Sequence, residues 1–179
     1  YLLHMDQLTA DSHILIEPIL NKKPHGFAMH GKKFNYGLMI KNIGDTPSVE
    51  FMIGDITLES AQGQNIIGTE TKQFYTSRLN PREEKHFDVG EHSSFMHGLV
   101  RISAKISPIE KERRVACFQR SPSTNTHLFV KTNDWVDFFY IKSPQEIAQE
   151  IANSRIRFLT FSILLLTLVY LIISIYLNR

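Results

Sequence analysis

The chain has 179 residues, of which 42% are hydrophobic and 21% are charged. Twenty Lys and Arg residues against eighteen Asp and Glu residues give a formal net charge of +2, far below that of a typical nucleic-acid-binding domain, so we expect no nucleic acid partner. Because the longest apolar run is confined to residues 158–177 and the rest has an ordinary globular composition, a polytopic membrane protein and a disordered chain are both excluded.

The chain begins with Tyr1 rather than Met, which is consistent with a processed N-terminus or with a fragment. We assign residues 1–12 to an N-terminal segment and residues 13–142 to one globular domain. A domain of this size buries a sizeable core without disulfides. The single cysteine, Cys117, excludes an internal disulfide framework.

Alternating apolar and polar residues predict strands over most of the globular domain. The clearest patterns are residues 33–41, which are followed by a turn at 42–47, and residues 100–106. Between them, apolar alternation over 49–58 changes phase at Gly54-Asp55, as a β-bulge would make it do. The remaining expected strands are 13–19, a weaker one over 66–75 after a turn at 61–65, 85–89, 114–119, 127–131 and 135–141.

Eight or nine short strands without a long helical pattern predict an all-β sandwich. Residues 34–41 with their turn at 42–45, the break at 79–83 and the strand at 98–106 resemble the immunoglobulin-like sandwiches of cell-surface and adhesion modules. The chain lacks the Cys…Trp…Cys core of antibody domains. The combination of a sandwich and a C-terminal anchor is also similar to the major-sperm-protein modules of tail-anchored contact-site proteins, whose ligand-binding residues do not align here. The expected fold is therefore mainly β: an immunoglobulin-like β-sandwich followed by a single C-terminal transmembrane helix.

One continuous helix is predicted over 144–177. Ser143-Pro144-Gln145-Glu146 has the pattern of a capping box, and neither Gly nor Pro follows Pro144. We divide this helix into a juxtamembrane stalk, 143–157, and a transmembrane part, 158–177, whose 20 uncharged residues span about 30 Å. A buried core helix is the alternative, although such a long uncharged run is unusual there. The expected anchor residues are Phe158, Leu165, Tyr170 and Tyr176.

The histidine-rich segment at 86–97 is a candidate metal site. His86, Asp88, His92 and His97 are competent ligands for zinc or copper, and His86 and Asp88 point the same way on a strand. The alternative is a solvated strand face opposite Phe87 and Val89. We expect no cofactor, with copper or zinc as the alternative.

The densest aromatic run precedes the stalk. Within it, Trp135, Phe139 and Tyr140 are candidates for partner contact or for a membrane-interface belt, the alternative being a last strand that packs its core face. Three small basic clusters, Lys22-Lys23, Lys32-Lys33 and Lys111-Glu112-Arg113-Arg114, are expected at hairpin tips or sheet edges. They either protect an edge or contact anionic headgroups.

Catalytic motifs are not found in the sequence, and Cys117 lies in an apolar strand context typical of inert thiols, so we expect no enzyme. The lipid bilayer and a protein partner are the expected partners. The predicted function is a single-pass membrane-anchored β-sandwich that acts as a non-catalytic protein-interaction or structural subunit of a larger membrane complex. The alternative is a copper- or zinc-handling accessory domain. Lys142, Arg155 and Arg157 flank one end of the span and Arg179 the other, which slightly favours a cytoplasmic sandwich.

Overall fold

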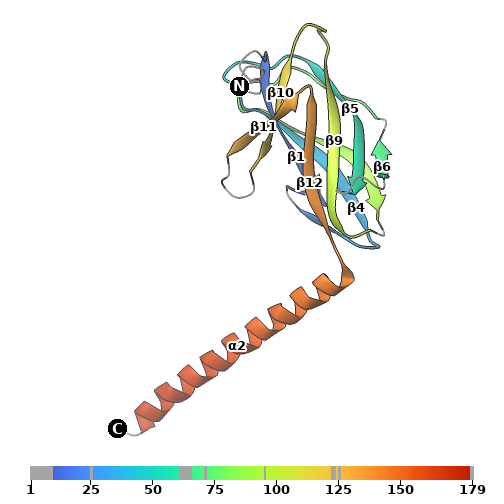
Figure 1. The fold of residues 1–179 in the computed structure, drawn as a ribbon. Helices are drawn as coiled ribbons and strands as arrows, with labels where there is room; N and C mark the ends of the chain where they lie inside the picture. The colour runs from blue at the N-terminus through green and yellow to red at the C-terminus, as the bar shows by residue number, and fades with distance from the viewer. Residues whose placement is uncertain are drawn as a thin grey trace. The chain divides into compact units, whose positions relative to one another are not determined.

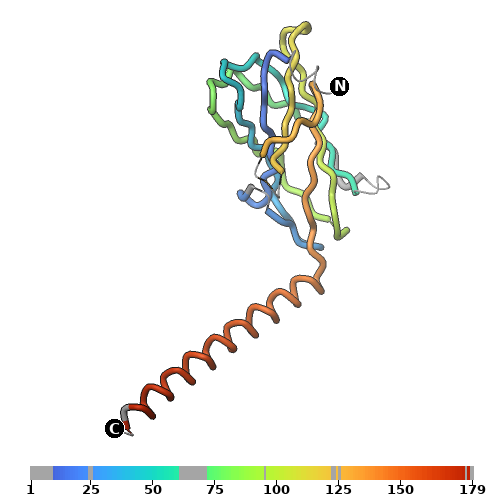
Figure 2. The backbone as a smooth tube through the Cα atoms, turned by 60° about the vertical axis from the view of Figure 1, so that its left-hand side comes forward, coloured from blue at the N-terminus to red at the C-terminus, as the bar shows by residue number. Residues whose placement is uncertain are grey.

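The computed structural model describes residues 10–24, 26–60, 66–70, 72–94, 96–121, 124 and 126–177. The chain divides into two compact units, Tyr1–Lys142 and Ser143–Arg179, each described by itself below (Figures 1 and 2). The first unit is built from strands and the second from one helix. The expected turn at 61–65 and most of the N-terminal segment lie outside the described residues.

Two six-stranded sheets face each other in the first unit (Figure 1). Sheet A has the order β11-β10-β1-β4-β8, with β2 paired to β1, and sheet B has the order β3-β12-β9-β5-β6, with β7 paired to β5. The strands of sheet A are β1 (Ser12–Leu20), β2 (Lys23–Pro24), β4 (Lys33–Asn42), β8 (Glu84–Ser93), β10 (Val115–Arg120) and β11 (His127–Thr132). Those of sheet B are β3 (Phe27–Met29), β5 (Phe51–Ser60), β6 (Ile66–Glu70), β7 (Phe74–Thr76), β9 (Gly98–Pro108) and β12 (Asp134–Lys142).

The order of the strands is that of an immunoglobulin-like sandwich. The chain crosses from sheet A to sheet B between β4 and β5 and again between β8 and β9, so that neighbours in the sequence lie in opposite sheets. The N-terminal part of the chain contributes to both sheets, since β1 pairs with β4 whereas β3 pairs in parallel with β12. The predicted class, a mainly β immunoglobulin-like sandwich with a C-terminal apolar helix, is confirmed.

The core lies between the two sheets and follows the predicted alternation. In β4, Phe34, Leu38 and Ile40 are buried, and in β9 Ile102 and Ile106 are buried. Each fully buried aliphatic or aromatic side chain of this kind contributes about 1.5–3 kcal/mol relative to its exposed state, so the inner faces account for most of the stability.

Two irregularities shift the alternation of the sheets. The pairing of β5 with β9 changes register between Gly54 and Thr57, and Asp55 has φ 50°, which confirms the predicted bulge. A second bulge lies in β8, where Val89 is the extra residue between the pairs Tyr36–Gly90 and Gly37–Asp88. A Cβ atom on Gly37 would lie 2.4 Å from the carbonyl oxygen of Phe87, so only glycine fits there.

Sequence periodicity missed the shortest strands. β2 and β3 contain two and three residues, too few to show a period, and the expected strand at 66–75 is divided into β6 and β7. The turn between β1 and β2 consists of Asn21 and Lys22, with φ 51° and 65°. Two consecutive positive φ angles are typical of a type I′ hairpin turn.

The β10–β11 hairpin, inserted between β9 and β12, extends sheet A (Figure 1). β10 runs parallel to β1, with Ser12 opposite Val115. A second, smaller apolar cluster forms here from Leu15, Ala116 and Phe118, so both faces of β1 are buried.

The second unit is the helix α2 (Pro144–Leu177), which has the predicted bounds. Ser143 and Glu146 form the predicted capping box. The hydroxyls of Thr160, Ser162 and Thr167 donate to the carbonyls four residues earlier at 2.9–3.0 Å. These three hydroxyls are thereby satisfied within the helix.

The helix is long and apolar enough to cross a membrane, and none of its most apolar window is buried. Of the predicted anchor residues, Phe158, Leu165 and Tyr170 are exposed, whereas the side chain of Tyr176 lies outside the described part of the structure. The alternative of a core helix does not match this exposure.

Candidate interaction surface

The four candidate metal ligands are not brought together. His86 and Asp88 are exposed on β8, opposite Met39 and Gly37 of β4. The bulge at Val89 shifts the phase of β8, so that His92 lies opposite Phe34 on the core side, with the two ring centroids 5.9 Å apart.

His97 follows β8 in a separate turn and contacts the ring of His30, with a centroid distance of 5.9 Å. Among the described residues, no group of three or more His, Cys, Asp or Glu side chains is placed to hold one metal ion. The failed convergence has a physical cause, because a one-residue bulge moves every later side chain of the strand to the other face.

The aromatic run of β12 is divided between the two faces of sheet B. Trp135 and Phe139 are 0% and 5% exposed and belong to the core, whereas Tyr140 is 38% exposed. Of the three candidate contact residues, therefore, only Tyr140 reaches the surface. Phe138, which the sequence analysis did not select, is 45% exposed beside it.

An exposed apolar cluster lies on the outer face of sheet B. Tyr140 is opposite Leu99 of β9 on one side and Phe27 of β3 on the other, and Phe138 is the next outward residue along β12. We call the residues Phe27, Leu99, Phe138 and Tyr140 the sheet B patch; all four are exposed. Contiguous exposed apolar side chains commonly mark contact sites.

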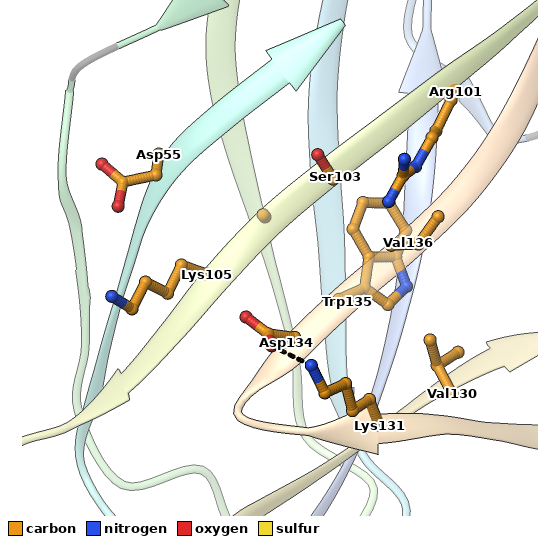
Figure 3. Close-up of a pocket in the computed structure, with 10 residues that line it drawn as sticks. Asp55, Arg101, Ser103, Lys105, Val130, Lys131, Asp134, Trp135 and Val136 are labelled. Atoms are coloured by element: carbon orange, nitrogen blue, oxygen red, sulfur yellow. Dashed lines mark hydrogen bonds and ion pairs between the residues drawn. The ribbon is translucent and has the colours of Figure 1, made fainter. Parts of the chain in front are cut away.

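A charged pocket of about 380 Å³ adjoins the sheet B patch (Figure 3). Arg101, Ser103 and Lys105 line it from β9, and Lys131 and Asp134 close its lower side in the figure. The Nζ atom of Lys131 donates to an Oδ atom of Asp134 at 2.8 Å, which raises the pKa of the Lys131 ammonium. Its remaining lining residues are Asp55, Ala104, Val130, Trp135 and Val136.

The wall of this pocket contains a buried polar atom. The Nε1 atom of Trp135 is inaccessible to solvent and has no hydrogen-bond partner among the described residues. In Figure 3 this nitrogen lies on the side of the indole that faces Val130. Buried indole N–H groups usually donate a hydrogen bond, so the unpaired Trp135 N–H is an exception to this rule.

A second pocket, of about 220 Å³, lies at the end of the sandwich where β4 begins. Phe27 and Met29 contribute apolar side chains, and Lys23, Lys32 and Lys33 contribute ammonium groups. We call it the lysine pocket. Its other lining residues are Leu20, Asn21 and Gly26. Since Phe27 also belongs to the sheet B patch, the two surfaces are continuous.

Cys117 is buried in β10, as its apolar context predicts. Burial raises the pKa of its thiol far above the ordinary value, and the nearby carboxylate of Asp134 acts in the same direction. The thiolate needed for nucleophilic or redox chemistry is therefore not formed at neutral pH.

Comparison with known proteins identifies similar folds only. No protein-family model and no curated protein sequence matches this chain. A crystal structure of the CARDB domain of the PF1109 protein from Pyrococcus furiosus, in complex with di-metal ions, is 16% identical, with a TM-score of 0.39, and the match covers 73% of this chain and 92% of that domain. The solution structure of the same domain is 17% identical over 74% and 94% of the two chains, with a TM-score of 0.37.

The ASH/PapD-like domain 7 of human CEP192 is 9% identical, with a TM-score of 0.27, and the match covers 74% of this chain and 82% of that domain. All three are β-rich modules at low identity. The metal ions named for the Pyrococcus domain concern that protein alone.

Proposed function

We propose that this protein is a single-pass membrane protein whose β-sandwich acts as a non-catalytic interaction or structural subunit of a membrane complex. The observation that carries the proposal is the sheet B patch, an exposed apolar cluster on a rigid sheet whose strand β12 continues through Ser143 into an apolar helix.

The anchor part of the proposal rests on the apolar half of α2. Residues 158–177 carry no charge, and about 20 helical residues match the thickness of the hydrocarbon core. Exposed apolar surface costs about 25 cal/mol per Å² in water, so this helix is far more stable in a bilayer. A span without ionisable residues has the properties of an anchor rather than of an ion path.

The interaction part rests on the composition of the sheet B patch. Aromatic side chains dominate the energetic centres of protein interfaces, and Phe27, Phe138 and Tyr140 provide three of them around Leu99. The strands beneath them are held by the core, so the side chains lose little backbone entropy on binding. Arg101 and Lys142 add a charged rim, and the Lys142 ammonium lies 3.9 Å from the Phe27 ring centroid.

The sandwich is proposed to lie on the cytoplasmic side of the membrane. Lys142, Arg155 and Arg157 precede the apolar half of α2, and basic residues are enriched on the cytoplasmic side of membrane spans.

The experiment is to purify the full-length protein from native membranes after chemical cross-linking and to identify the stoichiometric partner. A double variant, Phe138→Ser with Tyr140→Ser, should reduce the recovered partner at least tenfold. A control variant, Ile109→Ser with Leu128→Ser, replaces equally exposed apolar residues outside the sheet B patch and should leave recovery unchanged. An isolated wild-type monomer, or equal loss in both variants, would overturn the proposal.

A further inference from the structure

One end of the sandwich is rich in lysine. β12 ends there at Lys142, and β4 begins there at Lys33. Backbone hydrogen bonds hold the intervening segments together, from His30 to the carbonyl of Lys142 at 3.0 Å and from Asn21 to that of Asn35 at 2.8 Å. The lysines of this end are Lys22, Lys23, Lys32, Lys33 and Lys142.

Two of these lysines lie near a carboxylate. Lys33 pairs with Glu91 at 2.7 Å, and Asp88 lines a pocket together with Lys22. At the opposite end of the sandwich, Arg113 binds both Asp11 and Glu110, at 2.7 and 3.1 Å. The five lysines of the first end outnumber the two carboxylates that lie near Lys22 and Lys33.

The lysine pocket combines an apolar wall with a cationic rim. Phe27 and Met29 can contact one apolar side chain, while Lys23 and Lys32, which also line the pocket, can bind neighbouring carboxylates. From these contacts we infer that the lysine pocket binds an acidic segment of the partner protein, in which an apolar residue is flanked by Glu or Asp. This inference rests on the proposed function and names the chemistry of the partner.

An anionic membrane surface is the competing source of negative charge, and the shape of the lysine pocket argues against it. A peptide side chain fits a pocket of 220 Å³ better than a flat lipid surface does.

The test uses the full chain in phosphatidylcholine nanodiscs and a fluorescein-labelled peptide, Glu-Glu-Leu-Glu-Glu-Phe-Glu-Glu. Fluorescence anisotropy should show saturable binding that weakens with added salt. The same peptide with Gln in place of every Glu should bind at least tenfold more weakly. Absence of saturable binding by the acidic peptide would overturn the inference.

Charge-reversed variants locate the binding. The double variant Lys23→Glu with Lys32→Glu should weaken binding of the acidic peptide at least tenfold. The double variant Arg78→Glu with Lys111→Glu, at the opposite end, should bind the peptide with an affinity within twofold of wild type. Equal effects of the two double variants would contradict the inference.

Two further measurements distinguish a peptide ligand from a lipid surface, and a failure of this inference from a failure of the proposed function. If residues 21–33 are protected from hydrogen exchange in phosphatidylserine nanodiscs without peptide, the ligand of this end is a lipid surface and the inference of an acidic peptide is wrong. If the variant Lys23→Glu with Lys32→Glu keeps a partner whose recovery requires Phe138 and Tyr140, the inference is wrong and the proposed function stands. If no partner is recovered with the wild-type protein, the proposed function is wrong. The affinity for the peptide is measured without the partner, so it tests the lysine pocket separately.

Discussion

Ser143 and Glu146 bind each other reciprocally where the sandwich ends and the helix begins. The Ser143 hydroxyl accepts a hydrogen bond from the Glu146 backbone N–H at 3.2 Å, and the Glu146 carboxylate accepts one from the Ser143 backbone N–H at 2.7 Å. Two donors that the first turn of a helix would leave unsatisfied are thereby paired.

Removal of this cap should loosen the start of α2. Ser143→Ala should destabilise the first helical turn by about 1 kcal/mol. Hydrogen exchange of the amides at 145–148 should become faster by roughly fivefold, while Ser143→Asp, which keeps an acceptor, should preserve the wild-type rates. Equal exchange in Ser143→Ala and wild type would show that the cap is not formed in solution.

Phe138 and Phe139 lie on opposite faces of β12, so their alanine substitutions form a matched pair. Phe139→Ala should lower the free energy of unfolding by about 3–5 kcal/mol, since its ring packs against Phe34 in the core. Phe138→Ala should change it by less than about 1 kcal/mol, because its side chain is half exposed. Chemical unfolding of the full-length protein followed by Trp135 fluorescence measures both, and similar losses would contradict the assignment of faces.

The carboxylate of Asp11 should contribute a pH-dependent part of the stability. The Arg114 backbone N–H and then the Arg113 guanidinium donate hydrogen bonds to it, and both lower its pKa. A lowered folded-state pKa means that the stabilisation is complete above the unfolded value of about 3.9 and is lost as the pH falls through the folded value. Asp11→Asn should therefore melt at a lower temperature than wild type at pH 7 but not at pH 2. The control variant Asp45→Asn, at an exposed position, should have the melting temperature of wild type at both pH values.

His92 should make the sandwich less stable in mild acid. Its partial burial against Phe34 disfavours the charged imidazolium and lowers the pKa of His92. For a base, a lowered folded-state pKa means that stability is complete above the unfolded value of about 6.5 and declines as the pH falls through the folded value. His92→Gln should reduce the loss of melting temperature between pH 7 and pH 5. The exposed His127→Gln should leave this loss unchanged; an equal reduction in both variants would refute the role of burial.

The Cys117 thiol should be unreactive until the sandwich unfolds. A maleimide should label the native full-length protein at least a hundredfold more slowly than protein in denaturant, because the thiol is buried and its pKa is raised. The single native cysteine then permits a test of orientation. Lys111→Cys places a thiol on the surface, and in intact cells a membrane-impermeant maleimide should label it only after permeabilisation if the sandwich is cytoplasmic.

Local patterns made α2 and the long strands predictable. The cap at Ser143 and the absence of Gly and Pro set the bounds of the helix, while the alternation of β4 and β9 identified their buried faces. These features depend on residues within one or two turns or along one strand, which a sequence displays directly.

Long-range placement accounts for most of what the sequence left unknown. The bulge at Val89 in β8 is recognised only from the pairing of β8 with β4, and it changes which way His92 points, so the spacing within 86–97 did not show whether the histidines converge. In β12, aromatic residues occupy both faces, and only the packing of Trp135 and Phe139 shows which face is inward. The lysine pocket is lined by residues that lie close in the sequence, between Leu20 and Lys33, but β2 and β3 in this segment are too short to show a period.

The two parallel pairings have a consequence for biosynthesis. Ser12 meets Val115, and Phe27 meets Tyr140, so each sheet is joined across more than a hundred residues of chain. Such distant contacts are slow to form: sheet A cannot be completed before the ribosome has made β11, and sheet B not before β12. The residues translated next form the apolar helix, so the sandwich is completed just as the segment that we propose as the anchor leaves the ribosome.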